Sequence, residues 1–322
     1  MATSGSSRGK IILGIALAAI AVLVLGISIW QSKDAASPSS KTATSGKPSA
    51  LTTVAVLPFQ NMSGDKDSDF LRLALPDEMT TTLSYVRSLS IRPFATSSKY
   101  GGASVDVQQA GQEMHVSYVV TGHFLKAGNQ LEITLEAVDV ANNRTLWHDT
   151  LTAAAPDLIA MRSQIAAKVK QGLVPALGAG NDGSETFTRP NNEEAYDLYL
   201  RSLAVAHDPV PNKEAITMLE RAVGLDPNYA PAWAALGHRY SYDADYSDGG
   251  EAIHQRSNAA LERALALDPN LISASEWLIT NQVNRGNLLP AYFQAKTLVE
   301  RHPESAGPHF ALSYVLRYGG AT

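Results

Sequence analysis

A stretch near the C-terminal end of the chain occurs more than once. LERAVGLDPNYAPAWAAL (219–236) returns as LERALALDPNLISASEWL (261–278), and a weaker copy reads LVERHPESAGPHFAL (298–312). Prolines mark the register, because Pro227 and Pro269 lie 42 residues apart and Pro269 and Pro303 lie 34 apart. Self-similarity at such a period predicts stacked helical hairpins that bury their apolar faces only against one another.

The spaced residues within the repeat have a known pattern. Trp233, Leu236, Gly237 and Tyr240 lie at the first-helix positions of a tetratricopeptide repeat, and a period of 34 residues is typical of that family. Ala215, Leu219, Ala222 and Pro227 occupy its second-helix and turn positions. The C-terminal part, residues 193–322, therefore resembles an all-α tetratricopeptide solenoid of three repeats plus one helix. The repeats are expected at about 196–229, 230–271 and 272–305, with eight residues inserted in the second.

The resemblance implies a concave groove, lined by the first helix of each pair, that binds a peptide or a segment of another protein. Groove-facing positions carry over to His238, Ser241, Tyr242, Glu276, Thr280, Asn284, Phe310, Tyr314, Arg317 and Tyr318. Aromatic and arginine side chains are typical binding anchors, which favours Tyr242, Tyr314 and Arg317. The alternative for each residue is an ordinary packing or solvated role.

The region before the repeats, residues 51–178, reads as a small α/β domain with a mixed sheet. Strands are expected over 51–59, 89–94, 117–125, 130–140 and 144–153, and helices over 69–87, 105–115 and 154–173. Turns are expected at Gly128-Asn129 and Asn142-Asn143. A flexible linker over 179–192 joins this domain to the repeats.

Three parts of this region together resemble a TolB-amino-terminal-like domain over about residues 53–172. They are VAVLPFQNMSGD (54–65), Leu83-Ser84 leading into Ser90-Ile91-Arg92, and the block from Gly111 to Trp147. In bacterial relatives such a module lies between an N-terminal output domain and tetratricopeptide repeats. Here only ten residues precede an apolar segment at 11–30, which leaves no room for an output domain before it. The resemblance therefore carries over no output activity.

Residues 11–30 are uncharged and apolar enough to form a transmembrane helix of about 30 Å. A cleaved signal peptide is the alternative, but its apolar region is usually shorter. Residues 1–10 form a short tail, and residues 31–50 are rich in Ser, Ala, Lys and Pro, which predicts a flexible tether. We expect a single-pass protein of the inner (cytoplasmic) membrane of a bacterium, with its C-terminal domains on the periplasmic side.

Composition excludes several classes of function. The net charge of −5 and sequence pI near 5.9 argue against a nucleic-acid partner, and the chain contains no cysteine for thiol or zinc chemistry. The G-x-G-x-x-G at 178–183 and the G-x-S-x-G at 5–9 lack the strand–helix context that their chemistry needs. Asp65-Lys-Asp67-Ser-Asp69 opens like a calcium loop but lacks its Gly and Glu, so we interpret it as a helix-entry loop with Asp69 as possible N-cap.

The insertion YSYDADYSDGGE (240–251) reads as an exposed acidic loop, and the histidine spacing indicates no metal site. We therefore expect no catalytic residue, cofactor or metal, and a membrane-anchored, non-enzymatic protein-interaction scaffold. Alternatives are the sensor or regulatory half of a bacterial signalling or transcription regulator, and a small-ligand-binding or enzymatic α/β domain. The last helix has no polar capping repeat after it, which predicts a longer repeat protein or self-association through that helix.

Overall fold

The computed structural model describes residues 51–320, apart from 103–104, 156, 181–187 and 248, and these residues form one compact unit. The predicted transmembrane helix, tail and tether all lie outside the described residues. Within the described part of the chain, no helix combines the length and apolar character needed to cross a membrane.

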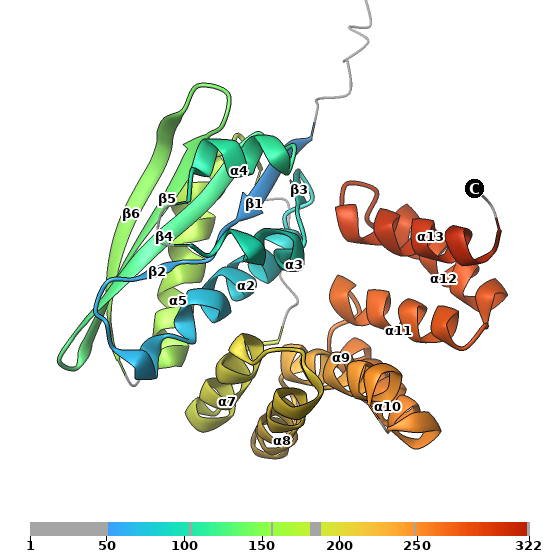
Figure 1. The fold of residues 1–322 in the computed structure, drawn as a ribbon. Helices are drawn as coiled ribbons and strands as arrows, with labels where there is room; N and C mark the ends of the chain where they lie inside the picture. Colours follow the sequence, from blue (N-terminus) through green and yellow to red (C-terminus); the bar gives the residue numbers. More distant parts are fainter. Residues whose placement is uncertain (1–50, 103–104, 156, 181–187, 248, 321–322) are drawn as a thin grey trace, which may run out of the picture. The chain divides into compact units, whose positions relative to one another are not determined.

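The first half is an α/β domain in the predicted order, with small additions (Figure 1). Its strands are β1 (Thr52–Val56), β2 (Gln60–Asn61), β3 (Leu89–Ile91), β4 (Tyr118–Ala127), β5 (Gln130–Asp139) and β6 (Arg144–Ala154). Its α-helices are α2 (Leu71–Ser84), α3 (Phe94–Ser97), α4 (Val107–Glu113), α5 (Leu158–Lys168) and α6 (Val174–Ala176). Two 3-10 turns, η1 (Lys66–Ser68) and η2 (Ser98–Tyr100), and a π-helical turn, η3 (Val169–Leu173), complete it.

The sheet is mixed, as predicted, in the order β3-β1-β4-β5-β6, with β2 pairing to β4. β1 runs parallel to β3 and β4, whereas β4, β5 and β6 form an antiparallel meander. Gly128, at φ +61°, and Asn129 form the two-residue turn between β4 and β5. The next turn contains Asn142, which donates two hydrogen bonds to the Asp139 carboxylate, and Asn143 at φ 47°.

Two apolar clusters cover the two faces of the sheet. A small one joins Ala55, Leu57 and Val119 to Ala110 and Met114 in and after α4. The larger one packs α2 and α5 on the opposite face and continues into the helical half. Asp69 is not the N-cap of α2, contrary to our prediction, because η1 intervenes and Asp65 caps that turn through the backbone N–H of Asp67.

The second half is all-helical, in consecutive antiparallel pairs. The helices are α7 (Glu193–Ala204), α8 (Pro209–Leu225), α9 (Ala230–Tyr246), α10 (Gly250–Leu267), α11 (Ile272–Asn284), α12 (Leu288–Arg301) and α13 (Ala306–Tyr318). These bounds match three hairpins followed by one helix. At Gly237 an added Cβ would lie 2.5 Å from Leu261 Cγ in α10, so the glycine permits the close helix approach that the sequence predicted.

The insertion in the second repeat is helix rather than an acidic loop, which corrects the sequence interpretation. α9 has 17 residues and α10 has 18, whereas the equivalent α11 and α12 have 13 and 14. The eight extra residues are therefore shared equally, at about one turn of about 5.4 Å per helix. Because each helix gains a whole turn, the connection between them stays short.

The α/β domain contacts the turns that join successive repeats; we call these contacts the turn seam. Tyr229, in the first turn, donates a 3.4 Å hydrogen bond to Glu78 of α2. Tyr85, just beyond α2, donates a 2.5 Å hydrogen bond to Asp268 in the second turn. In the third turn, burial lowers the pKa of His302, and the charge of Arg87 adds to this shift. The segment from Glu78 to Tyr85 therefore contacts two equivalent turns.

The centre of the turn seam is a buried ion pair. Glu78 and Arg162 of α5 are 6% and 7% exposed, and the Arg162 guanidinium donates to the Glu78 carboxylate. Beside it, the Tyr229 ring packs edge to face against Tyr196 and Tyr199, which stack on each other. Because this core is continuous, the α/β domain and the first repeat bury their apolar surface together.

Candidate partner-binding face

The first helices of the last hairpins bring several predicted groove residues together. Asn284 of α11 donates a 2.6 Å hydrogen bond to Asp245 of α9 and accepts a 3.0 Å hydrogen bond from the Tyr314 hydroxyl of α13. These contacts join α9, α11 and α13 at the C-terminal ends of α9 and α11.

Tyrosine rings surround this connection. Tyr242 packs on Tyr246 with ring centroids 4.6 Å apart, and Tyr314 packs on Tyr318 at 4.9 Å. Burial raises the pKa of Tyr314 to about 12, with further contributions from Tyr318, Tyr246 and Asp245. The two tyrosine pairs therefore lie close to one another across Asn284. We call Tyr242, Asp245, Tyr246, Asn284, Tyr314 and Tyr318 the tyrosine face.

The outer rings of the tyrosine face are open to solvent. Tyr246 is 68% exposed and Tyr318 is 58% exposed. Rings this exposed contribute little to the packing of the repeats. Clustered exposed aromatic rings are typical of binding surfaces.

His238 lies beside this face within a stack of rings. Its imidazole packs on Trp277 with centroids 3.8 Å apart and on His207 at 4.9 Å, and His207 also contacts Tyr242. Burial lowers the pKa of His207 to about 4 and that of His238 well below its ordinary value. Both histidines are therefore uncharged at neutral pH, and His238 acts mainly in packing.

Three other predicted residues lie away from the tyrosine face. Ser241 is 1% exposed and donates to Asn281, so it belongs to the interior between helices instead of the groove. The Thr280 hydroxyl donates to the backbone of Glu276, which is an internal helix contact. The Glu276 carboxyl lies against Gly307 at the start of α13, where Oε1 has no hydrogen-bond partner and burial raises the pKa to about 7.

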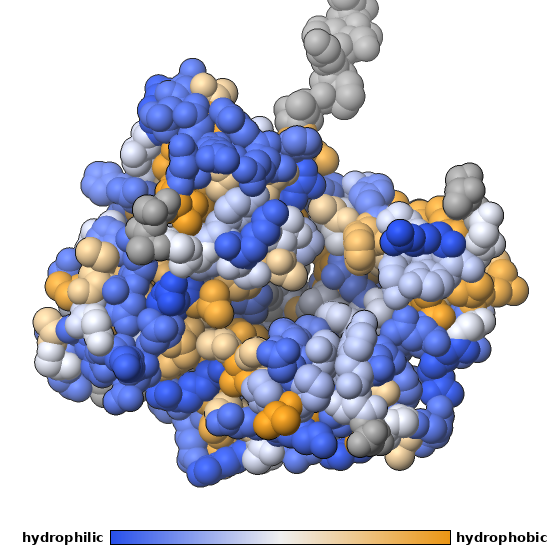
Figure 2. Space-filling view, viewed as in Figure 1, coloured by the Kyte–Doolittle hydropathy of each residue, from blue (hydrophilic) through white to orange (hydrophobic). Residues whose placement is uncertain are grey.

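The final helix also presents apolar surface. Phe310 is 66% exposed and stacks on Tyr314 at 6.2 Å, while Arg317 is exposed one residue before Tyr318. Leu289 and Phe293 of α12 are 67% and 58% exposed, and Figure 2 shows apolar side chains at this end of the chain. Val315 is buried, so only part of the predicted uncapped face is open.

Sequence reasoning missed Asp245 and Tyr246 as site residues. Both lie in the inserted segment that we interpreted as a loop, and the extra turn of α9 brings them beside Asn284 and Tyr314. The two proline spacings differ by eight residues, which equals about one turn for each helix of a pair. This difference could have indicated that both helices of the second repeat are longer.

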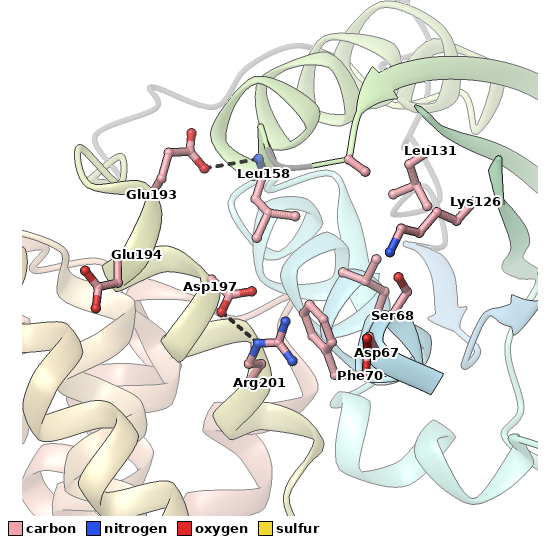
Figure 3. A pocket seen from close by; sticks show the side chains of 12 residues that line it. Asp67, Ser68, Phe70, Lys126, Leu131, Leu158, Glu193, Glu194, Asp197 and Arg201 are labelled. Carbon is pink, nitrogen blue, oxygen red and sulfur yellow. Dashed lines mark hydrogen bonds and ion pairs between the residues drawn. The ribbon is translucent and has the colours of Figure 1, made fainter. Parts of the chain in front are cut away.

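A separate pocket of about 340 Å³ lies between the α/β domain and α7 (Figure 3). Leu71, Leu131 and Leu158 form its apolar floor. Most of its charged lining residues already have partners: Lys126 pairs with Asp65, Arg201 with Asp197, and Glu194 with Arg221. Glu193 accepts a 3.1 Å hydrogen bond from the Leu158 N–H at the start of α5, and its burial raises the pKa of this carboxyl. The Glu193 bond joins α7 to α5, so the pocket lies at the contact between the two halves.

No group of three or more His, Asp or Glu side chains is placed to hold a metal ion in the residues that the structure describes.

Comparisons with known proteins concern parts of the chain. Residues 50–168 match a family model described as the second domain of HilA/YgeH-like transcriptional regulators. A protein of Rhizobium meliloti named "Putative adenylate cyclase 3" is 29% identical over 211 residues, which cover 64% of this chain and 36% of that protein. The peroxisomal targeting signal receptor of Komagataella phaffii is 30% identical over 117 residues, covering 36% of this chain and 18% of the receptor.

The chain thus spans about a third of the length of the cyclase relative and less of the receptor. Among solved structures, TolB from Acinetobacter baumannii is 18% identical, with a TM-score of 0.29 over 39% of this chain and 29% of that one. A score at this level does not establish a shared fold. Residues 50–168 are thus similar to a domain of transcriptional regulators, and 64% of the chain is similar to a protein named as a putative adenylate cyclase.

Proposed function

We propose that this chain is a membrane-anchored, non-enzymatic scaffold whose tetratricopeptide groove binds a segment of a partner protein. The observation that carries the proposal is the tyrosine face, where exposed rings from two helices lie around a hydrogen-bonded Asp245–Asn284–Tyr314 connection. The similarity to a peroxisomal targeting signal receptor over 117 residues agrees with protein binding.

In this proposal the TolB-like α/β domain holds the repeats in one curvature. Repeat arrays bend easily because each repeat contacts only its neighbours. The turn seam connects the α/β domain to two successive turns through Glu78 and Tyr85. Fixing the turns lowers the conformational entropy that the groove would lose when a partner binds.

Photo-crosslinking tests the proposed groove. A photoreactive phenylalanine analogue is placed at Tyr246 or Tyr318 of the full chain in cells, and at Val210 and Phe293 as exposed controls on α8 and α12. We expect the same partner to crosslink at the two groove positions and not at the controls. Equal crosslinking at all four positions would contradict a partner-specific groove.

A regulatory role in signalling is the second candidate, because residues 50–168 match a transcriptional regulator domain and 211 residues of the chain are similar to a putative adenylate cyclase. In that case the chain is a sensor or regulatory half whose output lies in another protein. The crosslinked partner then carries an output domain.

The membrane anchor at residues 11–30 and the periplasmic placement are part of the proposal and have a direct test. A C-terminal tag should be digested by protease in intact spheroplasts, with disrupted cells as a control. Protection in spheroplasts and digestion after disruption would place the repeats in the cytoplasm instead.

A further inference from the structure

The arrangement and the exposure of its rings make the tyrosine face suited to a positively charged group. Its rings come from opposite sides of Asn284, as Tyr242 and Tyr246 belong to α9 and Tyr314 and Tyr318 belong to α13. The outer rings, Tyr246 and Tyr318, keep more than half of their surface free. A ring face attracts cations through its quadrupole, and several rings together form an aromatic cage.

A carboxylate lies at the base of these rings. Asp245 accepts from Asn284 through Oδ2, and its Oδ1 lies 3.1 Å from His254 Nε2. These contacts fix the position of the carboxylate, whose side chain is 20% exposed.

Three nearby basic side chains do not compete for this carboxylate. His207 and His238 are kept neutral by burial, and Arg285 is already paired with Glu251. Arg317 is the exposed cation beside Tyr318, and it is the residue that an acidic partner would use.

We propose that the tyrosine face is a cation-binding site that holds a lysine or arginine side chain of the partner segment against Tyr246, Tyr318 and the Asp245 carboxylate. This deepens the proposed function and rests on it, since it states which side chain the groove selects. The partner segment is basic, complementary to a chain of net charge −5.

The test uses the full chain in neutral detergent micelles at 150 mM salt and a fluorescent hexalysine peptide, with binding measured by anisotropy. Hexalysine acetylated on its side chains is the uncharged control, and hexaglutamate is the acidic control. We expect binding of hexalysine alone. The double variant Tyr246→Leu/Tyr318→Leu keeps apolar area without the ring faces and should bind about tenfold more weakly.

Matched variants separate the cage from general charge attraction. Phe293→Leu alters an equally exposed ring on α12 and should change hexalysine binding less than about twofold. Arg317→Gln removes the competing cation and should strengthen it. Unchanged binding in the double tyrosine variant would overturn the proposal, as would hexaglutamate binding that Arg317→Gln abolishes.

The outcome is distinct from failure of the proposed function. If a partner crosslinks at Tyr246 and Tyr318 but the double tyrosine variant binds hexalysine as tightly as the unchanged protein, the scaffold proposal stands and the cation site is wrong. If hexalysine binds through the rings but no partner crosslinks there, the cation site stands and the scaffold proposal loses its support.

Discussion

The turn seam and the tyrosine face use similar residues in opposite ways. In the seam, Tyr196, Tyr199 and Tyr229 are at most 3% exposed and lie beside the paired charges of Glu78 and Arg162. On the tyrosine face, Tyr246 and Tyr318 are mostly exposed and the nearby carboxylate belongs to a surface network. The same residue type thus stabilises one region through burial and leaves the other available for binding.

The comparison predicts that the seam determines folding stability and the face does not. The largest effect is expected for Arg162→Met, which leaves the Glu78 carboxylate buried without its partner. Such a loss typically costs about 3–5 kcal/mol. Denaturant unfolding of residues 51–322 measures it. Arg221→Met is the matched control, because its pair with Glu194 is 64% and 51% exposed and should contribute less than about 1 kcal/mol.

The next largest effect concerns the packing of α9 against α10 within the second repeat. Gly237→Ala would place a methyl group 2.5 Å from Leu261, and overpacking of this kind costs about 1–3 kcal/mol. Gly224→Ala in α8 meets no atom within 4 Å and should stabilise the protein by about 0.5–1 kcal/mol through helix propensity. Thermal unfolding of both variants distinguishes them. Stabilisation by Gly237→Ala as large as that by Gly224→Ala would show that the helices do not approach as closely as described.

A smaller effect depends on pH. Burial raises the pKa of Glu276 to about 7, so the folded state keeps a proton that the unfolded state has released. Stability should therefore fall as pH rises from about 4.5 to 7 and level off above it. Glu276→Gln should be less sensitive in this window, with a gain of about 1–2 kcal/mol at pH 7.5. Asp77, whose pKa burial also raises to about 7, contributes equally to both proteins and cancels in the difference.

Urea titrations at pH 4.5, 6 and 7.5 provide this measurement, with the exposed Glu262→Gln as control. Parallel stability curves for Glu276→Gln and the unchanged protein would show that Glu276 is ionised and solvated in the folded state.

The smallest effect is expected on the tyrosine face itself. Tyr246→Leu/Tyr318→Leu changes rings that are more than half exposed, so the free energy of unfolding should move by less than about 0.5 kcal/mol. Calorimetry checks this prediction. A loss of 2 kcal/mol or more would mean that these rings are structural, and the contrast with the seam would fail.

The sequence predicted the features that depend on local spacing. Strand alternation in 130–140, the turn at Gly128-Asn129 and the three hairpins marked by Pro227, Pro269 and Pro303 all follow from short-range patterns. The mixed sheet followed by an all-helical region is confirmed.

The turn seam could not be predicted in this way. Tyr85 and Asp268 are 183 residues apart, and neither has a neighbour in sequence that marks it as an interface residue. The prediction of a loop over 240–251 was wrong for a different reason. This segment is rich in Asp, Ser and Gly, which is a loop composition, but tertiary packing holds it as helix. Ser241 illustrates a third limit. Repeat alignment gives its position on the helix, but its side chain donates a hydrogen bond to the buried Asn281 and does not face the groove.

The matched extension of α9 and α10 also bears on how such a protein changes over generations. Removing four residues from each helix would return the second repeat to the length of the third while leaving its Pro227 and Pro269 turns intact. Asp245 and Tyr246 would be lost with that turn, whereas Gly237, Leu261 and the α/β contacts lie outside it. The proposed binding face thus depends on one added turn in each of two helices, and the architecture of the repeats does not depend on that turn.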